Sequence, residues 1–220
     1  MNKLELNRPT LILMYGFPGS GKTYFARQLT QDLQAAHVQG DRIRSELFEE
    51  PRYDQQENDI VEHLMQYMAE EFLTAGISVV YDMNACRLAQ RRYLREMARN
   101  VKAQVVLIWF QIDSESAFLR ASKRDRRKTD DKYSMPIDRS LFEQSAGRMQ
   151  NPSNLEDFMV ISGKHTYTTQ RSAFFKRLYD LGIVSTDATH SKMVKPELVN
   201  LIPNPRAGRV DQSRRNIVIR

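Results

Sequence analysis

Eight consecutive residues near the start of the chain, Gly16 to Thr23, have types and spacing that suit binding of a phosphate group. They fit the pattern G-x-x-x-x-G-K-[S/T] at every fixed position. The glycines allow the backbone to fold back, so that successive N–H groups point at phosphate oxygens. We therefore expect a nucleotide phosphate to be bound by Gly16, Pro18, Gly19, Ser20, Gly21, Lys22 and Thr23.

Two side chains of this loop have further expected roles. Lys22 should contact the β- and γ-phosphates as a catalytic cation, and the Thr23 hydroxyl should hold Mg²⁺. ATP is favoured over GTP because no Asn-Lys-x-Asp segment follows downstream. The alternative interpretation, a glycine-rich turn with a solvated lysine, is disfavoured by the apolar run before the loop and the helical pattern after it.

An acid, Asp41, follows Gly40 immediately after the second expected strand, at the carboxyl end of that strand. Ligands of open α/β sheets bind at this edge. A carboxylate there can accept the proton of an attacking hydroxyl, and Arg44, one helical turn later, can clamp an anionic group of the acceptor. The alternative is that Asp41 only caps the helix that follows.

A second acid, Asp82, closes the apolar run of residues 77–81. Its position is typical of an acid that binds Mg²⁺ or orients an acceptor, and Asn84 is placed to assist it. Together with Thr23, Asp82 is the expected metal ligand.

Residues 120–128 hold six cations in nine positions. At helical spacing Arg120, Arg124 and Arg127 would form one stripe along a helix. Such a stripe could close over a triphosphate and stabilise the transferring charge. The alternative is a solvated basic helix end, which the helix dipole favours.

The elements that must position these residues alternate along the chain. Alternating strands and helices predict a parallel sheet between two helical layers, the α/β/α sandwich of P-loop NTPases. The expected strands are residues 11–15, 36–39, 77–81, 104–110 and 158–161, and the expected helices are 22–33, 55–75, 88–100, 114–127, 139–150 and 167–181.

This combination, over about residues 10–182, resembles the kinase domain of phage-type polynucleotide kinase and the zeta-toxin-like P-loop kinases. The resemblance implies the adenylate-kinase-like strand order 2-3-1-4-5. It also implies that Asp41 activates a 5′-hydroxyl and that Arg44 binds the neighbouring phosphate of the acceptor. Nucleotide phosphates would be bound by Arg120 with Arg124 or Arg127.

Length, composition and charge limit the number of domains and the expected cellular location. The 220 residues, 41% of them hydrophobic, suffice for one domain over residues 1–186, with an Arg-rich lid near 120–136 and a basic tail over 187–220. The tail carries seven cations and three acids out of a net charge of +6, which suits a nucleic-acid partner or simple solubility. No apolar run suggests a membrane partner, so we expect a cytoplasmic protein.

Three functions remain open at this stage. The first is a Mg²⁺- and ATP-dependent kinase whose acceptor is the 5′-hydroxyl end of RNA or DNA. The second keeps that chemistry with a nucleoside, sugar or nucleotide-sugar as acceptor. The third is an ATP-dependent RNA-binding switch protein without kinase activity, for which an acceptor base at Asp41 would have no use.

Overall fold

The sheet at the centre of the molecule has five parallel strands. The structure is a computed structural model that describes residues 3–129 and 131–184, so the expected tail over 187–220 lies outside the described residues. The order β2-β3-β1-β4-β5 confirms the predicted 2-3-1-4-5 topology. The strands are β1 (Thr10–Tyr15), β2 (Ala35–Gln39), β3 (Ser78–Asn84), β4 (Gln104–Gln111) and β5 (Met159–Ser162).

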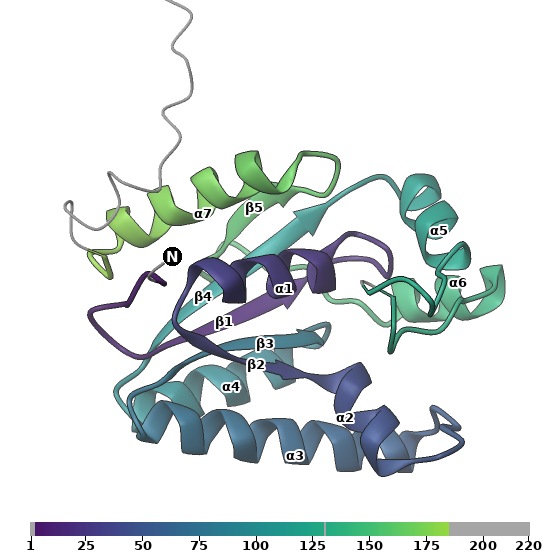
Figure 1. Cartoon of the computed structure of the whole chain (residues 1–220), viewed down its shortest axis with the longest axis horizontal. Coiled ribbons are helices and arrows are strands. Elements are labelled where there is room, and N and C mark those ends of the chain that lie inside the picture. The colour runs from purple at the N-terminus through teal and green to yellow at the C-terminus, as the bar shows by residue number, and fades with distance from the viewer. Residues whose placement is uncertain (1–2, 130, 185–220) are drawn as a thin grey trace, which may run out of the picture.

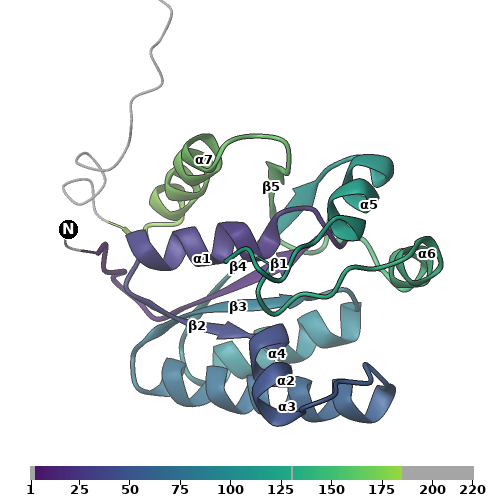
Figure 2. The ribbon, with the colours of Figure 1, turned by 45° about the vertical axis from the view of Figure 1, so that its right-hand side comes forward.

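Helices cover both faces of this sheet, as Figures 1 and 2 show. One face packs against α1 and α7, the other against α3 and α4, while α5 and α6 lie beyond the carboxyl ends of the strands. The helices are α1 (Lys22–Asp32), α2 (Gly40–Leu47), α3 (Gln55–Thr74), α4 (Leu88–Asn100), α5 (Ser114–Ser122), α6 (Arg139–Gly147) and α7 (Tyr167–Asp180).

The central strand β1 is buried at all six positions. Ile12 and Met14 pack in the core under α1 and α7, whereas Leu11 and Leu13 pack under α3 and α4. A strand covered on both faces needs apolar residues at consecutive positions, which explains its unbroken apolar run. Because β1 lies between β3 and β4, the loop that follows it emerges at the middle of the carboxyl edge.

The predicted helix over 114–127 is wrong over its last five residues, 123–127. Helix α5 ends at Ser122, and the described residues that follow, 123–129 and 131–138, are in irregular backbone. Cations that lie three or four residues apart on one face of a helix repel one another, which disfavours a further turn of α5. Arg124 and Arg127 therefore lie beyond the helix, and the predicted arginine stripe does not form.

Within residues 3–129 and 131–184, no helix is both long enough and apolar enough to span a membrane.

Candidate active site

The loop between β1 and α1 has the backbone that its glycines were expected to permit. Gly19 has a φ of 81°, and a Cβ at this position would collide with the carbonyl oxygen of Ala117. Gly21, the residue before α1, has a φ of 96°. Side chains rarely adopt either conformation, so the loop requires glycine at both positions.

Lys22, the first residue of α1, folds back into this loop. Its Nζ donates to the carbonyl oxygens of Gly16 (2.7 Å) and Phe17 (2.8 Å) and lies 3.4 Å from Ser20 Oγ. Burial, and to a lesser extent the positive charge of Arg124, lowers the pKa of Lys22 to about 7. An anion bound beside this amine would favour its charged form.

Thr23 and Asp82 meet across the sheet edge. The Thr23 hydroxyl donates to Asp82 Oδ1 at 3.1 Å, and Asp82 is 6% exposed. Strand β3 continues to Asn84, so Asp82 lies within the strand, two residues before its end. Asn84 Oδ1 accepts from the backbone N–H of Gly16 at 3.2 Å and thereby ties β3 to the loop.

A histidine that the sequence analysis did not single out also contacts Asp82. His37 Nε2 lies 3.0 Å from Asp82 Oδ2. The contact depends on the register of the two strands, in which Gln39 of β2 pairs with Asp82 of β3. His37 lies two residues before Gln39, within reach of the Asp82 side chain. That register is a tertiary fact, and the sequence alone does not supply it.

Asp41 lies in the first turn of α2, whose N-cap residue is Gln39. The capping alternative is therefore wrong. Asp41 Oδ2 accepts a hydrogen bond from the Ser134 hydroxyl at 3.0 Å, and Ser134 is 4% exposed. Burial raises the pKa of the Asp41 carboxyl, and the negative charge of Asp82 raises it further.

Arg44 shares α2 with Asp41, as predicted, but its guanidinium has other partners. It is 5% exposed and donates to Glu57 Oε2 at 3.1 Å and to Asn58 Oδ1 at 2.6 Å. It also lies 4.7 Å from the centre of the Tyr53 ring. These contacts direct Arg44 toward the start of α3, which differs from the expected position facing an acceptor.

The cations after β4 divide into two groups. Arg120 and Arg124 line the cavity described below, together with Lys123 and Lys128 from the same basic run. Arg120 also donates to the carbonyl oxygen of Gly163 at 2.7 Å. Arg127 does not line the cavity, because it is almost fully exposed and pairs with Asp125 at 3.0 Å.

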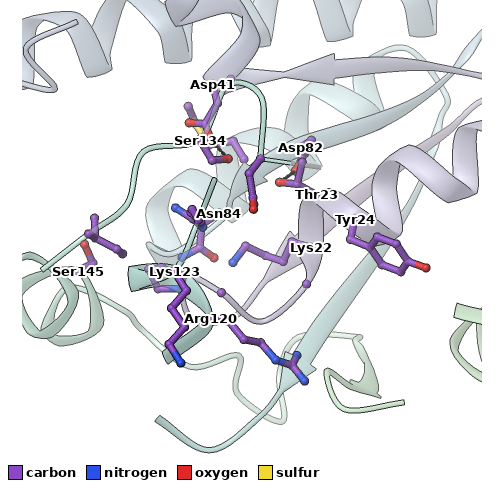
Figure 3. A pocket seen from close by; sticks show the side chains of 18 of the residues that line it. Lys22, Thr23, Tyr24, Asp41, Asp82, Asn84, Arg120, Lys123, Ser134 and Ser145 are labelled. Atoms are coloured by element: carbon purple, nitrogen blue, oxygen red, sulfur yellow. Dashed lines mark hydrogen bonds between the residues drawn. The ribbon is translucent and has the colours of Figure 1, made fainter. Parts of the chain in front are cut away.

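These groups surround one cavity of about 680 Å³, a size typical of small-molecule sites. Figure 3 shows Lys22 near its middle, with Asp41 and Ser134 at one end and Arg120 at the other. The Thr23–Asp82 pair lies beside Lys22. The cavity thus brings the phosphate loop, the two acids and the cationic segment together.

Residues 11–152 match the AAA domain family, and this range contains the phosphate loop, both acids and the cationic segment. The chain belongs to the AAA domain family. A search of curated proteins finds no match for it. The narrower resemblance to phage-type polynucleotide kinase stays a prediction.

Solved structures share the fold of this AAA domain at low sequence identity. A putative kinase from Chloroflexus aurantiacus is 13% identical with a TM-score of 0.63, over 80% of this chain and 98% of that one. Chaetomium thermophilum Kti12, solved with ADP-AlF3, is 18% identical with a TM-score of 0.60, over 80% and 100%. A sugar kinase from Janibacter sp. HTCC2649 is 16% identical with a TM-score of 0.56, over 80% and 95%.

The donor atoms of the AAA domain beside the phosphate loop fit Mg²⁺ in chemical type. This ion prefers oxygen ligands and is usually held by one or two carboxylates together with substrate phosphates and water. Thr23 and Asp82 supply a hydroxyl and a carboxylate 3.1 Å apart. Among the described residues, no group of three or more His, Cys, Asp or Glu side chains could hold a metal ion.

Proposed function

We propose that this AAA domain is a kinase that uses ATP and Mg²⁺ to phosphorylate a hydroxyl group. One observation carries the proposal. The cavity that contains Lys22 and Thr23 of the phosphate loop also contains the half-buried carboxylate of Asp41. A protein that only binds or hydrolyses ATP as a switch has no need of an acceptor base at this place.

The phosphates of ATP would be bound by the N–H groups of the loop and the positive end of α1. Lys22 would move its hydrogen bonds from the carbonyls of Gly16 and Phe17 to phosphate oxygens. Thr23 and Asp82 would hold Mg²⁺, which supplies charge neutralisation on the phosphates.

Asp41 would act as the acceptor base. As the acceptor oxygen bonds to the γ-phosphorus, its proton passes to the Asp41 carboxylate and the bond to the β–γ bridging oxygen breaks, which releases ADP. The raised pKa of Asp41 makes it a stronger base than an exposed aspartate. Its hydrogen bond from Ser134 has to open or be shared when the acceptor binds.

The cationic segment would stabilise the charge that develops during transfer. Arg120 and Arg124 line the cavity and are the proposed catalytic arginines, joined by Lys123 and Lys128. Arg127 is directed to Asp125 in this structure, so a role in phosphate binding would require that ion pair to break.

The acceptor that the geometry favours is a small molecule with a hydroxyl group. Ser134 and its segment cover Asp41, which limits the space at this end of the cavity. Arg44, the residue expected to bind a phosphate of a polynucleotide acceptor, is committed to Glu57 and Asn58. Solved structures of this fold include a sugar kinase and a gluconokinase, which agrees with this acceptor class.

The second candidate acceptor is a 5′-hydroxyl end of RNA or DNA. It is favoured by the cations Arg124 and Lys128 at the cavity and by the net charge of +6. Several phosphates of a bound strand would then displace counterions, whereas a small uncharged acceptor displaces few.

Salt dependence separates the two acceptor classes. We expect the KM for a small hydroxyl acceptor to change by less than about threefold between about 50 mM and 200 mM salt. The measurement compares the KM of a panel of nucleosides and sugars with that of a 5′-hydroxyl oligonucleotide at each salt concentration. An oligonucleotide that is the better acceptor, with a KM rising about tenfold or more over this range, would reverse the assignment in favour of nucleic acid.

Nucleotide binding should also take up protons at pH 8. With a pKa of about 7, Lys22 is mostly neutral there in the free protein, and it becomes charged beside the phosphates. Uptake should therefore approach about 0.9 proton per ATP, measured by calorimetry in buffers of different ionisation enthalpy. The Asp41→Asn variant removes any contribution of that carboxyl, and absence of uptake in this variant would contradict the proposed contact between Lys22 and ATP.

A further inference from the structure

The contact between His37 and Asp82 has no role in the reaction proposed above. His37 lies on β2 and Asp82 on the neighbouring strand β3, and the side chain of Asp82 is 3% exposed. One carboxylate oxygen, Oδ1, accepts from Thr23, and the other, Oδ2, lies 3.0 Å from His37 Nε2. Each oxygen of this buried carboxylate thus has its own partner.

We propose that His37 is a positioning residue that fixes the carboxylate of Asp82 for metal binding. The inference rests on the proposed function, because it takes Asp82 as a ligand of Mg²⁺. His37 would hold Oδ2 so that Oδ1 stays beside the Thr23 hydroxyl. A metal site loses affinity when the groups that orient its ligands are removed.

The chemistry of the pair fixes the direction of its hydrogen bond. As a metal ligand, Asp82 would be ionised, and an ionised carboxylate only accepts hydrogen bonds, so the ring N–H of His37 would donate. Without this donor, Oδ2 would be a buried acceptor lacking its partner, and the carboxylate could turn about its Cβ–Cγ bond. Loss of orientation would therefore accompany loss of the contact.

Rigid strands hold both residues of the pair. Strands β2 and β3 are parallel neighbours in which His37 pairs with Val80 and Gln39 with Asp82. The imidazole therefore reaches diagonally, from two positions earlier on the neighbouring strand. Side chains mounted on paired strands keep their separation better than side chains on loops.

His37 is not among the residues that line the cavity, so its effect should pass through Asp82. Thr23 and Lys22, in contrast, belong to the lining. This arrangement predicts that His37 governs metal affinity and leaves nucleotide affinity without metal unchanged. The two affinities can be measured separately.

The experiment uses the full chain with Mn²⁺ as the metal probe and AMPPNP, kept below the protein concentration, as the nucleotide. His37→Leu removes the donor, and His37→Gln restores an N–H at the position of Nε2. The control is His63→Leu, which changes an exposed histidine on α3. Fluorescence titration gives AMPPNP affinity in EDTA, and electron paramagnetic resonance gives Mn²⁺ affinity of the AMPPNP-bound protein.

We expect His37→Leu to lower Mn²⁺ affinity roughly 10- to 100-fold, with AMPPNP affinity in EDTA unchanged. His37→Gln should recover most of the loss, and His63→Leu should match the wild type. In an Asp82→Asn background, His37→Leu should have no further effect on Mn²⁺ affinity, because its partner is gone.

Three outcomes would overturn the positioning role. These are wild-type Mn²⁺ affinity in His37→Leu, equal losses in the Leu and Gln variants, or a parallel loss of AMPPNP affinity in EDTA, which would indicate a general effect on the fold. Failure of the wild type to bind AMPPNP in EDTA would instead remove the proposed function, and the role of His37 with it. Metal-free nucleotide binding thus distinguishes the two failures.

Discussion

Replacing Lys22 with alanine should weaken ATP binding by roughly 10- to 100-fold, because a charge-assisted hydrogen bond contributes about 1.5–3 kcal/mol. Phosphoryl transfer should fall further, since Lys22 would also stabilise charge on the moving phosphoryl group. The measurement is a titration with a fluorescent ATP analogue, followed by turnover of labelled ATP.

The fold should survive this change. The apolar core lies on both faces of the sheet and contains no part of Lys22. Burial lowers the pKa of Lys22, so its charged form is disfavoured at this place and its removal should not weaken the fold. Lys176→Ala, which changes an exposed lysine on α7, is the matched control. ATP affinity and turnover in Lys22→Ala equal to those of this control would contradict the assignment of the phosphate loop.

Replacing Asp41 with asparagine should lower turnover by roughly two to four orders of magnitude while ATP affinity stays nearly constant. General base catalysis commonly contributes this factor, and an amide cannot accept the proton. The measurement compares kcat and the ATP dissociation constant for Asp41→Asn with those for Asp180→Asn, an exposed acid on α7. Normal turnover in Asp41→Asn would leave Asp41 without a catalytic role.

The same Asp41 variant, which should lower turnover, should raise the stability of the fold. The folded protein raises the pKa of Asp41, so the protonated carboxyl is the form that folding favours. That favourable contribution is complete below the unfolded pKa and is lost as the pH rises through the folded pKa. Asparagine resembles the protonated form, so Asp41→Asn should have a higher Tm than the wild type at neutral pH, and the difference should shrink in acid.

The sequence predicted the central part of the site well because its signals are local. The segment from Gly16 to Thr23 directly follows a buried strand and runs into the first turn of a helix, and β1 and α1 confirm both. Asp41 and Asp82 lie at the carboxyl edge for the same reason, since each comes near the end of a predicted strand.

Other features depend on partners far along the chain, which local patterns do not encode. Ser134 bonds to Asp41 across 93 positions, and His37 reaches Asp82 across 45. Arg44 was expected at the acceptor, but Glu57, at the start of the next helix, pairs with it instead. Sequence spacing identified the functional side chains but did not show which hydrogen-bond or ion-pair partner each side chain has in the folded protein.

The central claim is that the γ-phosphoryl group of ATP moves to a hydroxyl acceptor with Asp41 as base. The most direct measurement incubates the full chain with Mg²⁺ and γ-labelled ATP against a panel of sugars, nucleosides and 5′-hydroxyl RNA and DNA, and separates the products by thin-layer chromatography. We predict that label appears on at least one acceptor with the wild type, and at a level lower by roughly two orders of magnitude or more with Asp41→Asn. Label found only in inorganic phosphate with every acceptor, at equal rates for the two proteins, would contradict the account.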